Sequence, residues 1–236
     1  MTAPGRGPGR AAEGDHTAVR YLPPWRIELT RRPGVPRLLS VDALARLCAA
    51  ALESARAAGP ASIGVILSDD PELAALNLRA MGRRGPTDVL SFPLLPPAAF
   101  PPHPGQTRGA PGPATAFALP PGALPHLGDI VVSVGRAVAQ AHEGRGGQTG
   151  DAAWAPADEL ALLVVHGVLH VCGWDHADAE EEAAMRALER RILADARRPH
   201  ASRPDAGHPA TSRPDAGDAD ASHARRPLAA RPARPR

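Results

Sequence analysis

Apolar and polar residues alternate over residues 25–29, a pattern typical of a β-strand with one buried face. Short apolar runs at residues 63–67, 89–92 and 130–132 predict three further strands. No run of 18 or more apolar residues occurs, so the sequence predicts no membrane-spanning helix.

Apolar residues spaced three and four positions apart predict helices. One stripe begins at Val41 and ends at Leu52, and either Ser40 or Asp42 can cap its helix. The other predicted helices follow residues 69–71, begin at Ser133 and at Asp158, and cover residues 178–196. The pattern thus predicts four strands and about five helices.

Proline separates one compact region from more open segments. Of the 28 prolines, 10 lie in residues 94–126 and 7 lie in residues 197–236. We therefore expect a single domain at residues 21–196, which contains a proline-rich inserted loop at 94–126. A disordered arm at residues 1–20 and a disordered Arg/Pro-rich tail at 197–236 are expected to flank it.

The net charge is only +2, but it is unevenly distributed. Nine arginines against four aspartates give the tail a net charge of +5, and the rest of the chain therefore carries about −3. All 27 basic residues are arginine. The nucleotide composition of the genome explains this choice as easily as selection for RNA binding does. The N-terminus lacks the apolar stretch of a signal peptide, and two cysteines make no disulfide framework, so we expect a cytoplasmic protein.

A run of three histidines carries the most specific chemistry in the chain. His166 and His170 are four residues apart, so on a helix their rings lie one turn apart on the same face. Gly173 can end that helix and turn the chain back, which brings His176 toward the same point. Three neutral imidazoles with an open fourth position are typical of a catalytic zinc site. We expect one zinc ion per chain.

The spacing matches the metzincin motif H-E-x-x-H-x-x-G-x-x-H in every ligand and in its glycine. Gly167, however, occupies the position where those proteases have glutamate, the base that takes a proton from metal-bound water. A metalloprotease is therefore the least favoured interpretation.

The run H-G-x-L-H-x-x-G-x-D-H resembles the signature of the YbeY family, the metal-dependent endoribonucleases of bacterial ribosomal-RNA maturation. Residues 76–77 with 86–93, and residues 127–133, resemble two further segments of the family in the same order. The resemblance implies a single zincin-like α+β domain, with a small mixed sheet packed with about five helices. It also implies a single-strand-specific endoribonuclease that acts on the small ribosomal subunit, in 16S RNA 3′-end maturation and subunit quality control.

One departure from the family pattern affects the expected chemistry. The family's tyrosine–arginine pair falls on Ala80 and Met81, so the arginine thought to assist cleavage is absent. Arg79, Arg83 and Arg84 are near in sequence and could bind a phosphate, or they could be solvated loop charges. No catalytic residue is assigned, and an alternative function is a metal-stabilised ribosome-associated factor that does not cleave RNA.

Other residues near the motif have more than one possible role. Asp175 could accept the second ring N–H of a ligand histidine, or it could cap the last helix. Cys172 could be a fourth metal ligand, but it would close the open position. Met185 fits the core stripe of its helix, and His142 and Asp129 could line the site, although the sequence does not place them.

Overall fold

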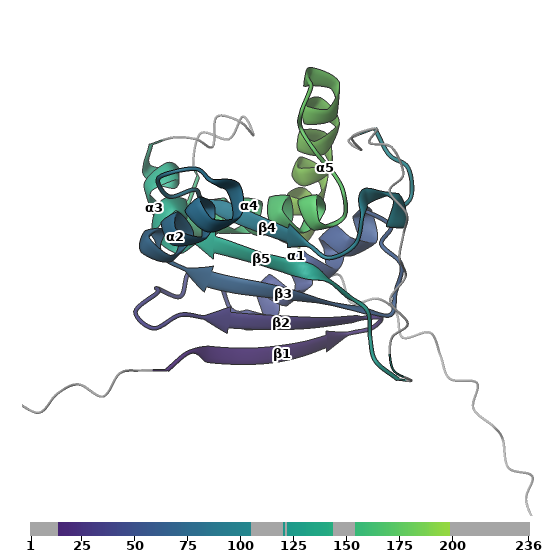
Figure 1. Cartoon of the computed structure of the whole chain (residues 1–236), viewed down its shortest axis with the longest axis horizontal. Helices are drawn as coiled ribbons and strands as arrows, with labels where there is room; N and C mark the ends of the chain where they lie inside the picture. The colour runs from purple at the N-terminus through teal and green to yellow at the C-terminus, as the bar shows by residue number, and fades with distance from the viewer. Residues whose placement is uncertain (1–13, 105–119, 121, 144–153, 199–236) are drawn as a thin grey trace, which may run out of the picture. The chain divides into compact units, whose positions relative to one another are not determined.

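The computed structural model describes residues 14–104, 120, 122–143 and 154–198. Its five strands form one sheet in the order β1-β2-β3-β5-β4 (Figure 1). They are β1 (His16–Leu22), β2 (Trp25–Arg31), β3 (Ala61–Ser68), β4 (Val89–Pro93) and β5 (His126–Ser133). The central β2, β3 and β5 are parallel, and the edge strands β1 and β4 are antiparallel to their neighbours. The predicted mixed sheet is confirmed.

Five α-helices lie within the described residues, in agreement with the predicted α+β class. They are α1 (Val41–Ser54), α2 (Asp70–Met81), α3 (Val134–His142), α4 (Pro156–Val171) and α5 (Ala179–Arg197). Side-chain oxygens cap four of them: Ser40, Asp69, Ser133 and Asp178 accept N–H groups of the first turns of α1, α2, α3 and α5. Asp178 rather than Asp175 therefore caps α5.

The main core lies between one face of the sheet and helices α1, α4 and α5. Helix α1 contacts β1 and β2, and α4 contacts β4 and β5. Alternating strand residues such as Ile27 and Ile63 are fully buried in this core. Helix α2 lies over the other face of the sheet, near β4 and β5 (Figure 1). No helix within the described part of the chain is long and apolar enough to cross a membrane.

The expected disordered arm at residues 1–20 is wrong at its C-terminal end. Strand β1 begins at His16 and pairs with β2 along its whole length. Its inward residues are Ala18, Arg20 and Leu22, which lie opposite Leu29, Ile27 and Trp25, and the charged Arg20 interrupts the apolar alternation in the sequence. Backbone pairing at a sheet edge therefore forms a strand that the side-chain pattern does not predict. Residues 1–13 lie outside the described residues.

The boundaries of the inserted loop and of the tail also differ from the prediction. Residues 97–99 form a short 3-10 helix, η1 (Pro97–Ala99), and Phe100 is buried in the main core. The first part of the 94–126 loop is therefore packed against the domain. Helix α5 continues to Arg197, which donates to Asp158 at the start of α4, so the helix extends into the expected tail. Residues 105–119, 121 and 199–236 lie outside the described residues.

Candidate metal centre and its cleft

Helix α4 carries the first two histidines of the predicted metal site. It begins at Pro156, two residues before Asp158, whose carboxylate accepts the N–H of Ala155 at 3.1 Å. The helix ends at Val171, and Gly173 follows with a φ of +82°, a conformation that glycine adopts without steric cost. This turn directs the following residues back along the helix, as the sequence predicted.

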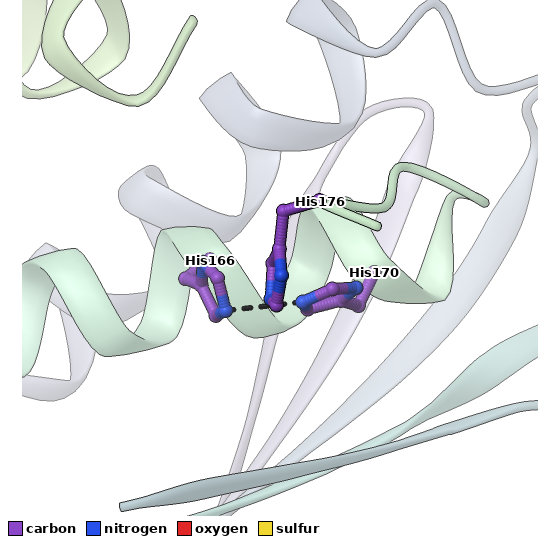
Figure 2. A group of neighbouring side chains, drawn as sticks. All are labelled: His166, His170 and His176. Carbon is purple, nitrogen blue, oxygen red and sulfur yellow. Dashed lines mark hydrogen bonds between the residues drawn. The ribbon is translucent and has the colours of Figure 1, made fainter. Parts of the chain in front are cut away.

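The three histidines converge at the end of α4 (Figure 2). One ring nitrogen from each of His166, His170 and His176 lies within 4.8 Å of the other two. The Nε2 atoms of His166 and His170 are 3.0 Å apart, close to the separation of about 3.3 Å expected for two nitrogens around tetrahedral zinc. His176 is exposed, whereas the other two rings are half-buried, so the cluster is open on the His176 side.

Fixed acceptors set the tautomers of the two helical histidines. The Nδ1 atom of His166 lies 2.7 Å from Oε1 of Glu189 on α5. The Nδ1 atom of His170 lies 2.8 Å from the backbone carbonyl of Trp174. A carbonyl and an ionised carboxylate can only accept, so both Nδ1 atoms donate and both Nε2 atoms present lone pairs when the rings are neutral. These lone pairs face one another, an arrangement that a bound cation would stabilise.

Burial keeps one ring of the cluster in the form that a metal requires. It lowers the pKa of His170 to about 4, with smaller contributions from His166 and His176. His170 is therefore neutral near pH 7 and can bind a metal without first losing a proton. The donor set and its hydrogen bonds fit a divalent metal that prefers imidazole, such as zinc.

Gly167 lies where α4 crosses close to the sheet. A Cβ atom at this position would be 3.1 Å from side-chain carbons of Ile130 and Val89. The carbonyl of Gly167 also accepts a hydrogen bond from Ser91 in β4 at 3.0 Å. A glutamate here would press on the side chains of Ile130 and Val89, so the packing at this crossing favours glycine over the metalloprotease base.

Asp175 and Cys172 have different surroundings from those of the ligand rings. Oδ1 of Asp175 accepts the backbone N–H of His176 at 2.8 Å, so it fixes the chain next to the third ligand. Its predicted contact with a ligand ring stays a prediction. Cys172 is fully buried, burial raises the pKa of its thiol to about 12, and it lies outside the histidine cluster. A zinc ligand would be a thiolate, so Cys172 belongs to the core.

Three further candidates can now be placed. Met185 is almost fully buried in the main core, which agrees with its helical spacing, and it also borders the site. Asp129 lies opposite Gly64 in the sheet and contacts His126, with 3.1 Å between Oδ1 and Nε2. His142 is exposed at the end of α3. Neither Asp129 nor His142 is among the described residues that line the site.

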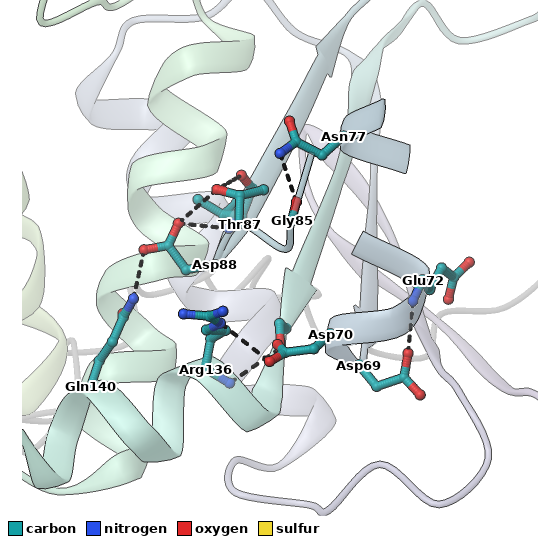
Figure 3. Close-up of polar contacts among 11 residues, drawn as sticks. Asp69, Asp70, Glu72, Asn77, Gly85, Thr87, Asp88, Arg136 and Gln140 are labelled. Carbon is teal, nitrogen blue, oxygen red and sulfur yellow. Dashed lines mark hydrogen bonds and ion pairs between the residues drawn. The ribbon is translucent and has the colours of Figure 1, made fainter. Parts of the chain in front are cut away.

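A cleft of about 1000 Å³ opens in front of the histidines. Residues of α2, β4, α4 and α5 line it. Its β4 side is held by polar contacts (Figure 3): the amide of Asn77 donates to the carbonyl of Gly85 at 2.9 Å, and Gln140 donates to Asp88 at 2.9 Å. These hydrogen bonds connect the β4 side of the cleft to α2 and α3.

The three candidate arginines differ in their relation to the cleft. Arg83 lines it, together with Met81 at the end of α2. Arg79 and Arg84 are exposed and are not among the described residues that line it. A role for Arg79 or Arg84 in binding RNA stays a prediction. Met81 is 53% exposed, so the position is open to a ligand in the cleft.

The inserted loop contacts the turn that follows α4. The rings of His103 and Trp174 are stacked, with centroids 3.9 Å apart and an interplanar angle of 7°. A Cβ atom at Gly173 would lie 3.0 Å from Cα of Pro97, so the two backbones approach closely. Because the carbonyl of Trp174 holds the ring of His170, the insertion packs against a residue that orients a ligand.

The sequence did not lead us to Glu189 or to the contact between His103 of the inserted loop and Trp174. Glu189 is only 7% exposed, although it is charged and carries no apolar signal of its own. Its position four residues after Met185, on the apolar stripe of α5, could have identified it, because an unpaired carboxylate is rarely buried. No comparable signal exists for His103.

Comparisons with known proteins agree with this geometry. The family model described as Endoribonuclease YbeY matches residues 38–197. An Endoribonuclease YbeY of Salinispora tropica is 38% identical over 168 residues, which cover 71% of this chain and 94% of that protein. One of Thermobifida fusca is 36% identical over 174 residues, which cover 73% and 94%.

Among solved structures, the solution structure of TM1509 from Thermotoga maritima covers 72% of this chain and 90% of its own, with 22% identity and a TM-score of 0.41. The family assignment rests on the family model and on the two sequence relatives. This chain belongs to the YbeY family of endoribonucleases.

Proposed function

We propose that this chain cleaves single-stranded RNA with one zinc ion bound by His166, His170 and His176. The observation that carries the proposal is the pair of Nδ1 contacts, to Glu189 and to the Trp174 carbonyl, which leaves two Nε2 lone pairs directed to one point. That point opens into a cleft large enough for a segment of an RNA strand.

A zinc ion bound there would supply a Lewis acid and would lower the pKa of its water toward about 7. The protein's own part is to keep the ligands in place and neutral. Glu189 and the Trp174 carbonyl hold two rings by their Nδ1–H groups, and burial keeps His170 unprotonated. The cleft offers no glutamate at position 167, so we assign no general base to a side chain.

We further propose that the RNA is ribosomal, with action at the 3′ end of 16S RNA during maturation and quality control of the small subunit. The support is membership of the endoribonuclease family, whose name implies an RNA substrate. A ribosomal substrate would place the protein in the cytoplasm, with the small subunit as its partner.

A second candidate function is a metal-stabilised factor that binds the small subunit and does not cleave RNA. Met81 favours it, because a thioether that is open to the cleft cannot form the charged contact that an arginine would give to a phosphate.

Cleavage of a 16S 3′-end RNA fragment would test the proposal. We expect the zinc-loaded protein to cut it and the chelated protein to leave it whole. The variant His166→Ala/His170→Ala should be inactive, whereas His142→Ala, which removes an exposed histidine outside the cleft, should retain activity. Cutting by a metal-free double variant would refute the proposal. A loaded protein that binds the subunit without cutting would establish the second candidate instead.

A further inference from the structure

The positive charge of the cleft comes from two arginines on different elements. Of the described residues that line it, Arg83 follows α2 and Arg186 lies on α5. Five acidic residues also line it, each with a partner: Asp88 accepts from Gln140, Glu159 from Trp154 and Asp175 from the backbone N–H of His176, Glu182 pairs with Arg186, and Glu189 contacts His166. Among these lining side chains, a polyanion can therefore find a permanently charged cationic partner only in the two guanidinium groups.

Arg186 lies on the same face of α5 as Glu189. The two residues are three positions apart, so their Cβ atoms are neighbours on the helix surface. Glu189 reaches Nδ1 of His166, and Met185 beside Arg186 also lines the cleft. Of the four arginines of α5, Arg186 is thus the one among the described residues that line the cleft, on the helix whose Glu189 contacts His166.

The side chain of Arg186 is held in place and can still bind a new partner. One of its terminal nitrogens is 2.5 Å from Oε1 of Glu182, and both side chains are close to half exposed, at 43% and 45%. A guanidinium has five N–H donors, so this ion pair leaves others available. Exposed ion pairs between residues four apart are weak, and a phosphate can replace such a carboxylate.

We propose that Arg186 contacts a backbone phosphate of the RNA strand next to the metal centre, and that Glu182 positions the guanidinium before the strand binds. The inference rests on the proposed RNA substrate and deepens it, because it assigns a substrate-binding residue to α5. Arg83 lies on another wall of the cleft and would contact a different phosphate of the same strand.

Binding of a fluorescently labelled 2′-O-methyl oligouridylate to the zinc-loaded protein would test the contact. We expect Arg186→Gln to weaken binding about 3- to 10-fold and to reduce the slope of log K against log salt by about 0.7, the value for one phosphate contact on a single strand. Glu182→Gln keeps a side-chain oxygen that can accept from and position the guanidinium but removes a negative charge from the cleft, so it should tighten binding. The matched control is Arg191→Gln, which removes the same charge from an exposed part of α5 outside the cleft and should change binding less than about twofold.

The outcomes separate this inference from the proposed function. If the wild type cleaves RNA and Arg186→Gln binds as tightly as the wild type does, the phosphate contact is refuted and the nuclease stands. If the wild type binds RNA through Arg186 without cleaving it, the contact stands and the nuclease is refuted. If Arg186→Gln and Arg191→Gln weaken binding equally, the loss follows from the change in overall charge, and the proposed contact is refuted. A wild-type protein that does not bind the oligonucleotide would also refute it.

Discussion

Oε1 of Glu189 lies 2.7 Å from Nδ1 of His166, and this contact joins α5 to the helix that carries two of the proposed metal ligands. Glu189 is buried, so its carboxylate lies in surroundings where an ion pair or hydrogen bond is little screened by water. The metal site therefore depends on the docking of α5 as well as on the histidine motif.

Replacing Glu189 should weaken metal binding without removing a ligand. We expect Glu189→Ala to lower zinc affinity by about 10- to 100-fold, because the ring of His166 loses the acceptor that fixes its tautomer. Glu189→Gln keeps an amide oxygen at that position and should lose less. Competition with a coloured chelator would measure both, with Glu180→Gln in the exposed first turn of α5 as the control. An unchanged affinity in Glu189→Ala would show that the contact does not support the site.

The metal-free protein should lose stability as the pH falls from about 6.5 to about 4. Burial lowers the pKa of His170 to about 4 in the folded state, and unfolding returns it to its ordinary value of 6.5. Between these values the unfolded chain binds more protons, so the free energy of unfolding decreases with falling pH, by on the order of 2–3 kcal/mol.

Urea unfolding of the chelated protein across that pH range would measure this dependence. The variant His170→Gln should show a flatter profile, because its side chain does not titrate. Parallel profiles for the wild type and the variant would contradict the assignment of the pH dependence to His170.

Gly167→Ala should destabilise the fold. The new methyl group would lie 3.1 Å from side-chain carbons of Ile130 and Val89, so these side chains or α4 must move, at a cost of about 1–3 kcal/mol that a gain in helix propensity of up to about 1 kcal/mol offsets only in part. Gly135→Ala is the matched control, because a Cβ atom there meets only the Ser133 hydroxyl at 3.8 Å and α3 gains helix propensity. Urea midpoints would compare them. Equal stability of Gly167→Ala and the wild type would mean that α4 has space at this crossing.

His103→Ala should reduce both stability and zinc affinity. Loss of the stacked ring on Trp174 should lower the free energy of unfolding by about 0.5–1.5 kcal/mol. The carbonyl of Trp174 holds His170, so a freer Trp174 should also weaken zinc binding. His103→Phe retains a ring for stacking and should restore zinc affinity. If neither variant changes zinc affinity, the insertion packs on this turn without supporting the metal site.

The parts of the site that were predictable from sequence are those set by local spacing. His166 and His170 are one helical turn apart by their numbers alone, and Gly173 identifies the turn that returns His176. The supporting residues depend on tertiary packing. Glu189 reaches His166 from another helix, and its place on the apolar stripe of α5 indicates a buried carboxylate but not its partner.

In the fold, too, elements with a local apolar pattern were predictable and elements that depend on tertiary contacts were not. The central strands β3 and β5 were predictable because their residues are buried and apolar. Strand β1 was missed because the charged Arg20 interrupts the apolar residues of its inner face, so its pairing with β2 leaves no clear alternation in the sequence. Phe100 was missed as a core residue because the prolines around it indicate a loop, and a loop can still place one aromatic ring in the core.

The contact between Glu189 and His166 has a consequence for how the protein is made. A ribosome completes the sheet, α4 and all three histidines before it adds α5. A nascent chain at that stage contains every metal ligand but lacks the carboxylate that orients the first of them and the cleft arginine beside it. The enzyme therefore acquires its working centre only near the end of domain synthesis, so incomplete chains carry the motif without a competent site.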